Sequence, residues 1–226
     1  MKYFEICDSI DTKVIGHDFP QSYKLKKGFN PDATNSFYDT CRSWRDNKFP
    51  TFTPNLNGLQ LNKRCKITDS LSTCFLHVPL LNKRTLDLFN EFNLCEHRVY
   101  PAKVYWKEEL QYYFLFPIDP MEKYIIWNES RFKLVVRGEE LNMPTVNSKD
   151  EFIEESRKLR VSAYRNAREQ IIELKVDSNF NLDFFILKRI GSALSYFVSQ
   201  RLMDAINQNG ITGFSIKSEF TITKAN

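Results

Sequence analysis

Four residues of the types that bind zinc lie in the first half of the chain, Cys74 with His77 and Cys95 with His97. Thiolate and imidazole are the usual ligands of a structural zinc ion. However, only one residue separates Cys95 from His97, which is shorter than the spacing of ordinary zinc-binding motifs. We therefore expect both cysteines to be small core residues, with no metal bound.

Nucleophilic catalysis needs a thiol or hydroxyl beside a base. Cys41 lies close to Arg42 and Arg45, whose charges would lower the pKa of an exposed thiol. The sequence places no base there, so a buried structural cysteine is the favoured alternative. Paired carboxylates occur at Glu108-Glu109, Glu139-Glu140 and Glu154-Glu155. Adjacent side chains diverge on a helix or strand, and no phosphate-binding or nucleophile motif occurs. We expect no enzyme activity and no cofactor.

An Arg-rich stripe is the first candidate binding surface. If residues 148–168 are helical, Arg157, Arg160, Tyr164 and Arg168 follow one another at steps of three or four residues and share a face. Arginine and tyrosine are enriched at binding hot spots. The alternative is a solvated face held by the upstream glutamates, in which Glu154 pairs with Arg157 or Lys158 at helical spacing.

A second candidate surface is the segment that carries Arg42, Trp44 and Arg45, followed by Phe49 and Phe52. Proline and asparagine turn signals surround it, so we expect a well-packed loop within a loop-rich region over residues 16–62. The alternative is that its aromatic side chains simply cover the sheet.

Three helices and several strands must position these surfaces. Apolar spacing and capping residues predict helices at Asn82–Asn93, Ser148–Arg168 and Ser199–Asn207. Aromatic and β-branched runs predict strands at 2–7, 98–106, 111–116, 124–127, 132–136, 171–176, 184–187, 214–216 and 220–222. The expected class is α+β, a mostly antiparallel sheet packed by a few helices. We expect lobes at 1–97 and 98–226, or one continuous domain.

The chain also contains an internal similarity. Residues from Arg84 to Val99 align with residues from Arg201 to Ile216 at a constant offset of 117. Each segment reads as a helix, a tight stop and a strand. The alignment indicates two similar helix–strand units on one sheet or on related lobes, unless it reflects only the general likeness of amphipathic helices.

Composition bounds the function. The chain has 226 residues with a net charge of +4, a smaller basic excess than a dedicated nucleic-acid binder usually carries. Its five cysteines form no CxxC pair, which suits a reducing compartment. No secretory signal or membrane-length apolar run is visible. We expect a cytoplasmic protein that has no membrane partner and is monomeric before it binds its target.

The C-terminal part resembles a known family. The resemblance is carried by Leu182-Asp-Phe-Phe-Ile-Leu187, Tyr196-Phe-Val-Ser-Gln-Arg-Leu202, Asp204-Ala-Ile206 and Gly210-Ile-Thr-Gly-Phe214, with weaker likeness at 1–6 and in the central strands. These segments are similar to immunity proteins of bacterial polymorphic toxin systems, the family first described around a myxobacterial immunity protein. The matched positions are mainly apolar or turn-forming, so they bear on the fold more than on a site.

The resemblance implies a protein that binds a co-encoded toxin domain and blocks it. An Arg-rich surface on this chain would then face an acidic surface on the toxin. The alternative function is a nucleic-acid-binding module that uses the Arg-rich helix for phosphates and the aromatic loops for stacking.

Overall fold

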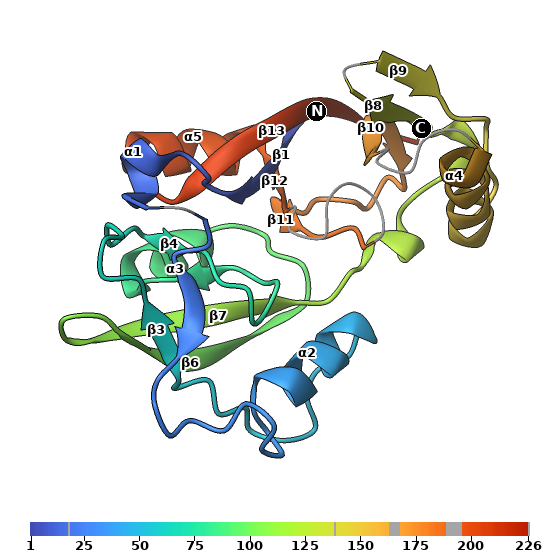
Figure 1. Cartoon of the computed structure of the whole chain (residues 1–226). Coiled ribbons are helices and arrows are strands. Elements are labelled where there is room, and N and C mark those ends of the chain that lie inside the picture. Colours follow the sequence, from blue (N-terminus) through green and yellow to red (C-terminus); the bar gives the residue numbers. More distant parts are fainter. Residues whose placement is uncertain (18, 138, 163–167, 189–195, 226) are drawn as a thin grey trace.

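Two mostly antiparallel sheets with helices packed on them form the fold (Figure 1). The computed structural model describes residues 1–17, 19–137, 139–162, 168–188 and 196–225. The expected α+β class is confirmed. Within the described segments, no helix has the length and apolar composition needed to cross a membrane.

The first unit comprises the strands and helices between residues 22 and 117. Its sheet has the order β2-β3-β6-β7-β5-β4. Its elements are β2 (Ser22–Leu25), α2 (Phe37–Arg45), β3 (Leu59–Leu61), β4 (Ser70–Leu71), β5 (Leu80–Leu81), α3 (Lys83–Phe89), β6 (His97–Tyr105) and β7 (Glu109–Pro117).

The second unit follows from residue 121 onward and also includes the N-terminal strand. Its sheet has the order β11-β12-β1-β13-β10-β8-β9. Its elements are β1 (Lys2–Asp8), η1 (Met121–Lys123), η2 (Trp127–Glu129), β8 (Arg131–Val136), β9 (Glu139–Asn142), α4 (Lys149–Ser162), β10 (Arg168–Val176), β11 (Phe184–Phe185), β12 (Tyr196–Ser199), α5 (Gln200–Gln208) and β13 (Phe214–Lys224); α1 (Thr12–Ile15) connects β1 to the first unit.

The two units repeat one topology. Read from the other edge, the second sheet runs β8-β10-β13-β1-β12-β11, with β9 added outside β8. In each unit one inner pair is parallel, β3 with β6 and β10 with β13, and the other described neighbours are antiparallel. Helices α2 and α4 precede β3 and β10, while α3 and α5 precede β6 and β13. Strand β1 takes in the second unit the place that β7 takes in the first.

The internal similarity at an offset of 117 is therefore a relation between two lobes. It pairs α3 with α5 and the N-cap Asn82 with the N-cap Ser199. Both caps accept a hydrogen bond from the third helical residue, Thr85 in one case and Leu202 in the other. A side-chain cap of this kind satisfies one of the free amides at a helix start.

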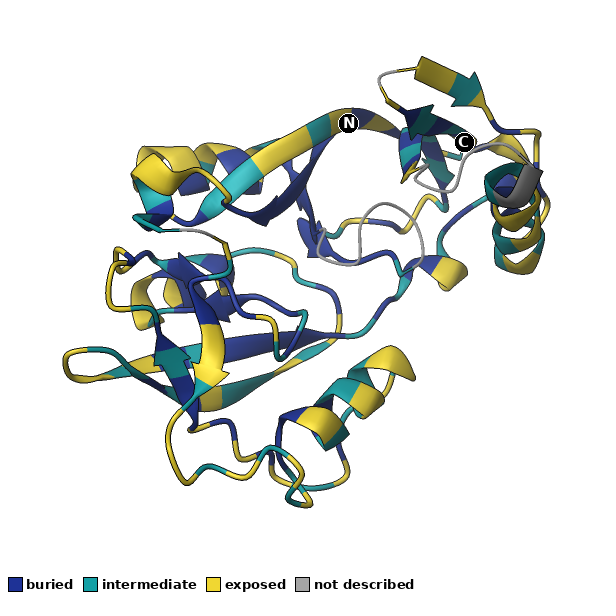
Figure 2. Ribbon diagram, in the orientation of Figure 1, coloured by how far each residue is buried: buried dark blue, intermediate teal, exposed yellow. Residues whose placement is uncertain are grey.

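The units share apolar surface as well as topology. Leu86 and Phe89 of α3 are buried in the core of the second unit, where the Phe89 ring lies 5.5 Å from the ring of Phe184. Strand β7 directs Phe114 into the first core and Leu115 into the second. Figure 2 shows buried residues along β7, β11 and β12, between the outer elements of the two lobes. The lobes are consequently held together by the second core, which takes in side chains from both units.

Several expected boundaries differ from the structure. The sheets divide the chain near residue 118, and not at residue 97, because β6 and β7 pair with the strands before them. The strand expected at 124–127 is wrong: the segment lies between the helical turn η1 and the start of η2, with one isolated bridge, Ile125 to Val176. Helix α3 ends at Phe89, ahead of the predicted stop at Asn93. The two strands expected after residue 213 are one strand, β13.

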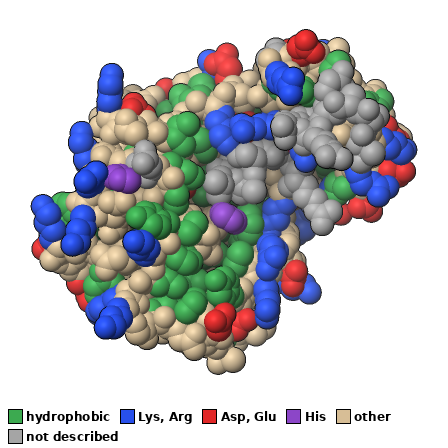
Figure 3. Space-filling model, viewed as in Figure 1, with side chains coloured by type: hydrophobic (Ala, Val, Ile, Leu, Met, Phe, Trp, Pro, Cys, Tyr) green, Lys and Arg blue, Asp and Glu red, His purple; other side chains and the backbone are tan. Residues whose placement is uncertain are grey.

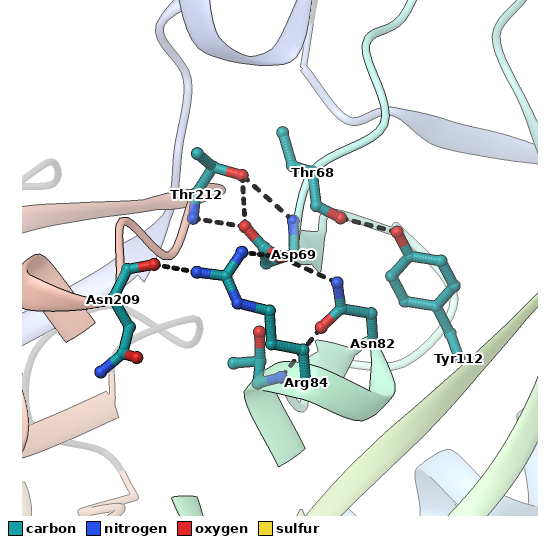
Figure 4. A network of polar contacts seen from close by, with 8 residues as sticks. Thr68, Asp69, Asn82, Arg84, Tyr112, Asn209 and Thr212 are labelled. Carbon is teal, nitrogen blue, oxygen red and sulfur yellow. Dashed lines mark hydrogen bonds and ion pairs between the residues drawn. The ribbon is translucent and has the colours of Figure 1, made fainter. Parts of the chain in front are cut away.

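A pair of carboxylates joins the units reciprocally. Asp69, just before β4, accepts hydrogen bonds from the Asn82 side chain at 2.8 Å and from the Thr212 backbone amide at 2.8 Å (Figure 4). Asp183, just before β11, accepts them from the Ser199 hydroxyl at 2.6 Å and from the Asn93 amide at 3.0 Å. Each carboxylate thus binds the helix cap of its own unit and the turn after the helix of the other unit.

An arginine completes each of these carboxylate sites. The Arg84 guanidinium lies 3.8 Å from the Asp69 carboxylate and donates a hydrogen bond to the Asn209 carbonyl oxygen. Arg201, its equivalent in α5, forms an ion pair with Asp183. An aspartate and an arginine therefore recur at equivalent places in both units, and their contacts hold the two units in a fixed relation.

Gly213 lies at a close approach between the two units, against the backbone of Ser70. Replacing it by alanine is expected to lower the free energy of unfolding by about 3 kcal/mol or more. The new Cβ would lie 2.1 Å from the Ser70 carbonyl oxygen, and the residue has a φ of +100°. Gly210 is the matched control, because its φ is +59° but a Cβ added there would have no atom within 4 Å; its alanine variant should lose only about 1 kcal/mol. Urea denaturation measures both, and equal losses would contradict the close approach.

Candidate partner-binding surface

Three of the predicted site residues, Arg42, Trp44 and Arg45, lie on helix α2. The expected loop at this position is therefore wrong. Phe37, Thr40 and Trp44 recur at helical spacing, with Phe37 and Thr40 buried, so this face packs inward while Arg42 and Arg45 are exposed. That spacing was a usable signal, but the surrounding turn residues obscure it.

Phe37 anchors α2 to the first sheet. Its side chain is fully buried, and its ring centre lies 5.6 Å from the ring of Phe29, 5.6 Å from Phe75 and 6.2 Å from Phe114 on β7. Aromatic contacts at these distances add to the free energy gained by burial. The helix is therefore fixed to the sheet, which gives its outer face a defined position.

Trp44 is half-buried and contacts two polar side chains from other segments. The Lys188 amino group lies 4.6 Å from the centre of the Trp44 ring and donates a hydrogen bond to the Trp44 carbonyl oxygen. The His77 ring meets Trp44 edge-on, with ring centres 6.2 Å apart. Burial lowers the pKa of Lys188 to about 8, against the attraction of Asp119, and burial also lowers the pKa of His77.

Asp119 ties the end of α2 to the start of α4. Its backbone exchanges two hydrogen bonds with the Asn47 side chain, at 2.8 and 3.1 Å. Its carboxylate accepts from the Lys149 amino group at 3.3 Å, the Lys188 backbone amide at 2.9 Å and the Met121 amide at 3.0 Å. The side chain is 1% exposed. The two equivalent helices thus meet at one buried carboxylate in the segment that links the units.

Exposed cations surround this junction, and we call four of them the basic rim: Arg42, Arg45, Lys48 and Arg98. The Arg98 guanidinium lies 4.4 Å over the ring of Phe49, just beyond α2. The rim is not purely cationic, because Asp39 pairs with Arg42 at 3.3 Å and Asp46 is exposed. Figure 3 shows Lys and Arg side chains at the edge of the lower lobe where Figure 1 places α2, next to hydrophobic side chains.

The Arg-rich stripe predicted on one helix is not formed as expected. Helix α4 is described as far as Ser162, and Arg168 begins strand β10 opposite Val135. The strand prevails because residues 168–176 pair with both β8 and β13. Tyr164 lies outside the described residues. Arg157 is exposed on α4 and Arg160 is partly exposed.

Arg160 has a structural partner that the sequence did not reveal. Its guanidinium forms an ion pair with Glu169, whose side chain is 6% exposed, and the Ser156 hydroxyl donates to the same carboxylate. The upstream acidic residues pair instead with Lys158, which lies 3.1 Å from Glu154 and 2.8 Å from Glu155. The predicted pairing of this helix with its own glutamates is therefore confirmed at Lys158.

The candidate chemical groups are separated by the fold. In the part of the chain that the structure describes, no group of three His, Cys, Asp or Glu side chains is arranged to hold a metal ion. Cys95 is a buried core residue as expected, but Cys74 is exposed, so the expectation of a core position is wrong for Cys74. His97 is hydrogen-bonded to the Cys95 carbonyl oxygen at 2.8 Å. Burial raises the pKa of Cys41 and outweighs the nearby Arg45, which fits a structural cysteine, the alternative that the sequence favoured, better than an activated thiol.

No protein-family model matches this sequence, and no curated protein matches it.

The sequence alone did not indicate a role for Lys188, which belongs to the second unit, or for Asp119, which lies in the link between the units. Neither stands in a motif, and both reach α2 only through tertiary folding. The only local signal is the pattern of buried strands on either side of Lys188 and Asp119. This pattern predicts where the two residues lie in the fold, but it does not predict a contact with Trp44.

Arg157 and Arg160 are expected to differ sharply in their effect on stability. Arg160→Ala should lower the free energy of unfolding by about 2 kcal/mol, because the buried Glu169 carboxylate loses its counterion. Arg157→Ala should change it by less than about 0.5 kcal/mol, as is usual for exposed positions. Chemical denaturation measures both; a large loss for Arg157→Ala would contradict this assignment.

The Asp119 carboxylate is expected to be essential for the contact between α2 and α4. Asp119→Asn should cost about 2 kcal/mol of unfolding free energy, since an amide has one acceptor oxygen and cannot accept both at the Oδ2 position, from Lys149 and Lys188, and at the Oδ1 position, from Met121. Glu122→Gln is the matched control: it also lies near Lys149, at 3.8 Å, but its side chain is 73% exposed, so about 0.5 kcal/mol or less is expected. Similar losses in thermal and urea unfolding would refute a special role for Asp119.

Proposed function

We propose that this protein binds the toxic domain of a co-encoded toxin and neutralises it by covering its active site or its substrate path. The resemblance of residues 182–187 and 196–214 to immunity proteins supports this proposal. In the fold these residues belong to β11, β12, α5 and the start of β13, and their apolar side chains are mostly buried. The resemblance therefore bears on the second unit as a scaffold, and the contact surface has to come from elsewhere.

The observation that carries the proposal is the arrangement at α2. Arg42 and Arg45 are exposed beside the Trp44 ring, which contacts the Lys188 amino group and the His77 ring. Tryptophan and arginine are the side chains most often found at binding hot spots. Because α2 is already anchored by Phe37 and joined to α4 through Asp119, little conformational entropy is lost on binding. A rigid surface of this kind suits a protein inhibitor.

Nucleic-acid binding is less well supported. A base stacks on an open aromatic face, but the Lys188 amino group already covers Trp44. Asp39 and Asp46 also interrupt the basic rim, which would repel a continuous phosphate backbone. The Arg-rich helix stripe on which this alternative depended is not formed.

Binding should be tested with the toxic domain encoded beside this protein. The wild-type chain is expected to bind that domain and to rescue cells that express it. Arg42→Glu combined with Arg45→Glu should slow association about tenfold or more at low salt, because the basic rim would no longer attract an acidic surface. Surface plasmon resonance at several salt concentrations measures the rate.

The matched control is Lys63→Glu combined with Arg64→Glu, two exposed cations in the turn after β3. This variant carries the same charge change and should associate at close to the wild-type rate. Absence of both binding and rescue would refute the proposed function. Binding of single-stranded RNA with a steep salt dependence, and no binding of the toxic domain, would favour the nucleic-acid alternative.

A further inference from the structure

Seven exposed cations lie on α1, on β2 and the residues after it, and on the turn that follows β3. We call them the lysine-rich face: Lys13, Lys24, Lys26, Lys27, Lys63, Arg64 and Lys66. Among the described residues, none of the seven lies within ion-pair distance of a carboxylate. Other exposed cations of the same unit, such as Lys83, are paired with an acidic neighbour. An anion that binds the lysine-rich face therefore has no internal ion pair to displace.

The sequence around these cations is almost without acidic residues. Residues 12–17, 19–28 and 59–67 contain no Asp or Glu, and Asp18 lies outside the described residues. The whole chain has 32 Lys and Arg against 28 Asp and Glu; without the seven cations and Asp18, 25 and 27 remain. The rest of the chain is thus slightly acidic, and the small net charge conceals one strongly basic surface. Figure 3 shows Lys and Arg side chains along the left side of the lower lobe, with few acidic ones among them.

Hydrogen bonds hold the three segments side by side. Strand β2 pairs with β3. In the turn after β3, the Asn62 amide donates to the Gln21 carbonyl oxygen at 3.0 Å, and the Lys66 amide donates to the Ile15 carbonyl oxygen at 2.7 Å. The Lys66 amino group also donates to the Lys13 carbonyl oxygen at 2.8 Å. The cations therefore belong to one contiguous surface with a fixed backbone.

An exposed aromatic ring lies within this surface. Tyr23 on β2 is 45% exposed, and its hydroxyl oxygen lies 3.5 Å from the side-chain nitrogen of Asn62 in the turn. The Lys24 amino group is 5.1 Å from the centre of the Tyr23 ring. At the boundary with the β6–β7 hairpin, the Lys26 amino group lies 3.8 Å from the centre of the Tyr105 ring. Positive charge and an accessible aromatic ring therefore occur side by side.

We infer that the lysine-rich face binds single-stranded nucleic acid, with its cations at the phosphates and a base stacked on Tyr23. Single-strand binding surfaces combine cations that follow the backbone with aromatic rings on which bases stack. Protein interfaces, in contrast, are depleted in lysine and enriched in arginine, whereas six of these seven cations are lysines. A lysine ammonium is a point charge on a flexible stem, which suits a flexible chain of phosphates.

Tyr23 distinguishes nucleic acid from other polyanions. Every base presents a π-face that can stack on an aromatic ring. An acidic peptide segment and an anionic lipid headgroup supply negative charge but no base. The inferred activity goes beyond the proposed function, because the lysine-rich face shares no residue with helix α2 or the basic rim.

The probe is an oligouridylate of about twelve nucleotides, a length in the range of single-strand sites, with a fluorescent label at one end. Fluorescence anisotropy measures its binding to the full-length protein at several salt concentrations. Each neutralised phosphate contributes about −0.7 to the slope of log K against log salt. A slope of about −3 is expected, which corresponds to about four phosphates.

Removing charge from β2 tests the face directly. The combined variant Lys24→Gln, Lys26→Gln and Lys27→Gln should bind about tenfold or more weakly, and its salt slope should be shallower by about 2. The matched control is Arg42→Gln, Arg45→Gln and Lys48→Gln, three exposed cations of the basic rim. Because these lie outside the lysine-rich face, the control should change affinity less than about twofold.

Tyr23 gives a readout that charge alone does not. Tyr23→Leu should weaken binding about fivefold or more, since a stacked base is lost. Its salt slope should stay within about 0.5 of the wild-type slope, because no phosphate contact is removed. Tyr23→Phe keeps the ring and should bind within about twofold of wild type, which separates loss of stacking from loss of folding.

The inference is overturned if the oligouridylate does not bind at low salt, or if the triple lysine variant or Tyr23→Leu binds it as tightly as wild type. Equally tight binding of a glutamate peptide of the same charge, or of vesicles that contain phosphatidylserine, would also overturn it. If the toxic domain binds and the oligouridylate does not, the proposed function stands and this inference is wrong. If the oligouridylate binds at Tyr23 and the toxic domain does not bind, this inference stands and the proposed function is wrong.

Discussion

The reciprocal carboxylates Asp69 and Asp183 are the constraint on which the arrangement of the two units depends. Burial alone would raise the pKa of each carboxylate, but hydrogen bonds outweigh burial and lower both pKa values. Asp69 accepts these hydrogen bonds from Thr212 and Asn82. Asp183 accepts them from Arg201, Ser199 and Asn93. A lowered pKa means that the contribution of each group is present above the ordinary pKa of aspartate and is lost as pH falls through the folded value. The contact between the units is thus built for the ionised form of both carboxylates.

This junction determines where the candidate surface lies. The repeated units are joined through α3 and α5, while their other equivalent helices, α2 and α4, lie at the bottom of the lower lobe and at the right of the upper lobe (Figure 1). Asp119 then connects the end of one to the start of the other. Trp44 from the first unit meets Lys188 from the second only because of this placement. The binding surface proposed at α2 therefore belongs to the pair of units and to neither alone.

Local patterns in the sequence were sufficient for the parts of the fold that have local causes. Asn82 and Ser199 cap their helices as their positions predict, and the offset of 117 between them reflects a true repeat of topology. The sequence does not predict helix α2, because this helix is short and polar and has turn residues on both sides. Arg168 was assigned to a helix because helical spacing continued through it, whereas pairing with two strands decides its structure. The contact of Trp44 with Lys188 joins positions 144 residues apart, and no spacing rule encodes it.

The placement of β1 has a consequence for how the chain folds during its synthesis. Strand β1 lies between β12 and β13, so it leaves the ribosome long before either neighbour has been made. The first unit can pair all its strands while translation continues, but the second stays open until β13 emerges. During that interval the apolar residues Tyr3, Phe4 and Ile6, all buried in the finished protein, have no sheet to join. The second half of the nascent chain is therefore the part most exposed to proteases and to misassociation. The second sheet closes when β13, the last strand to be synthesised, pairs with β1, the first.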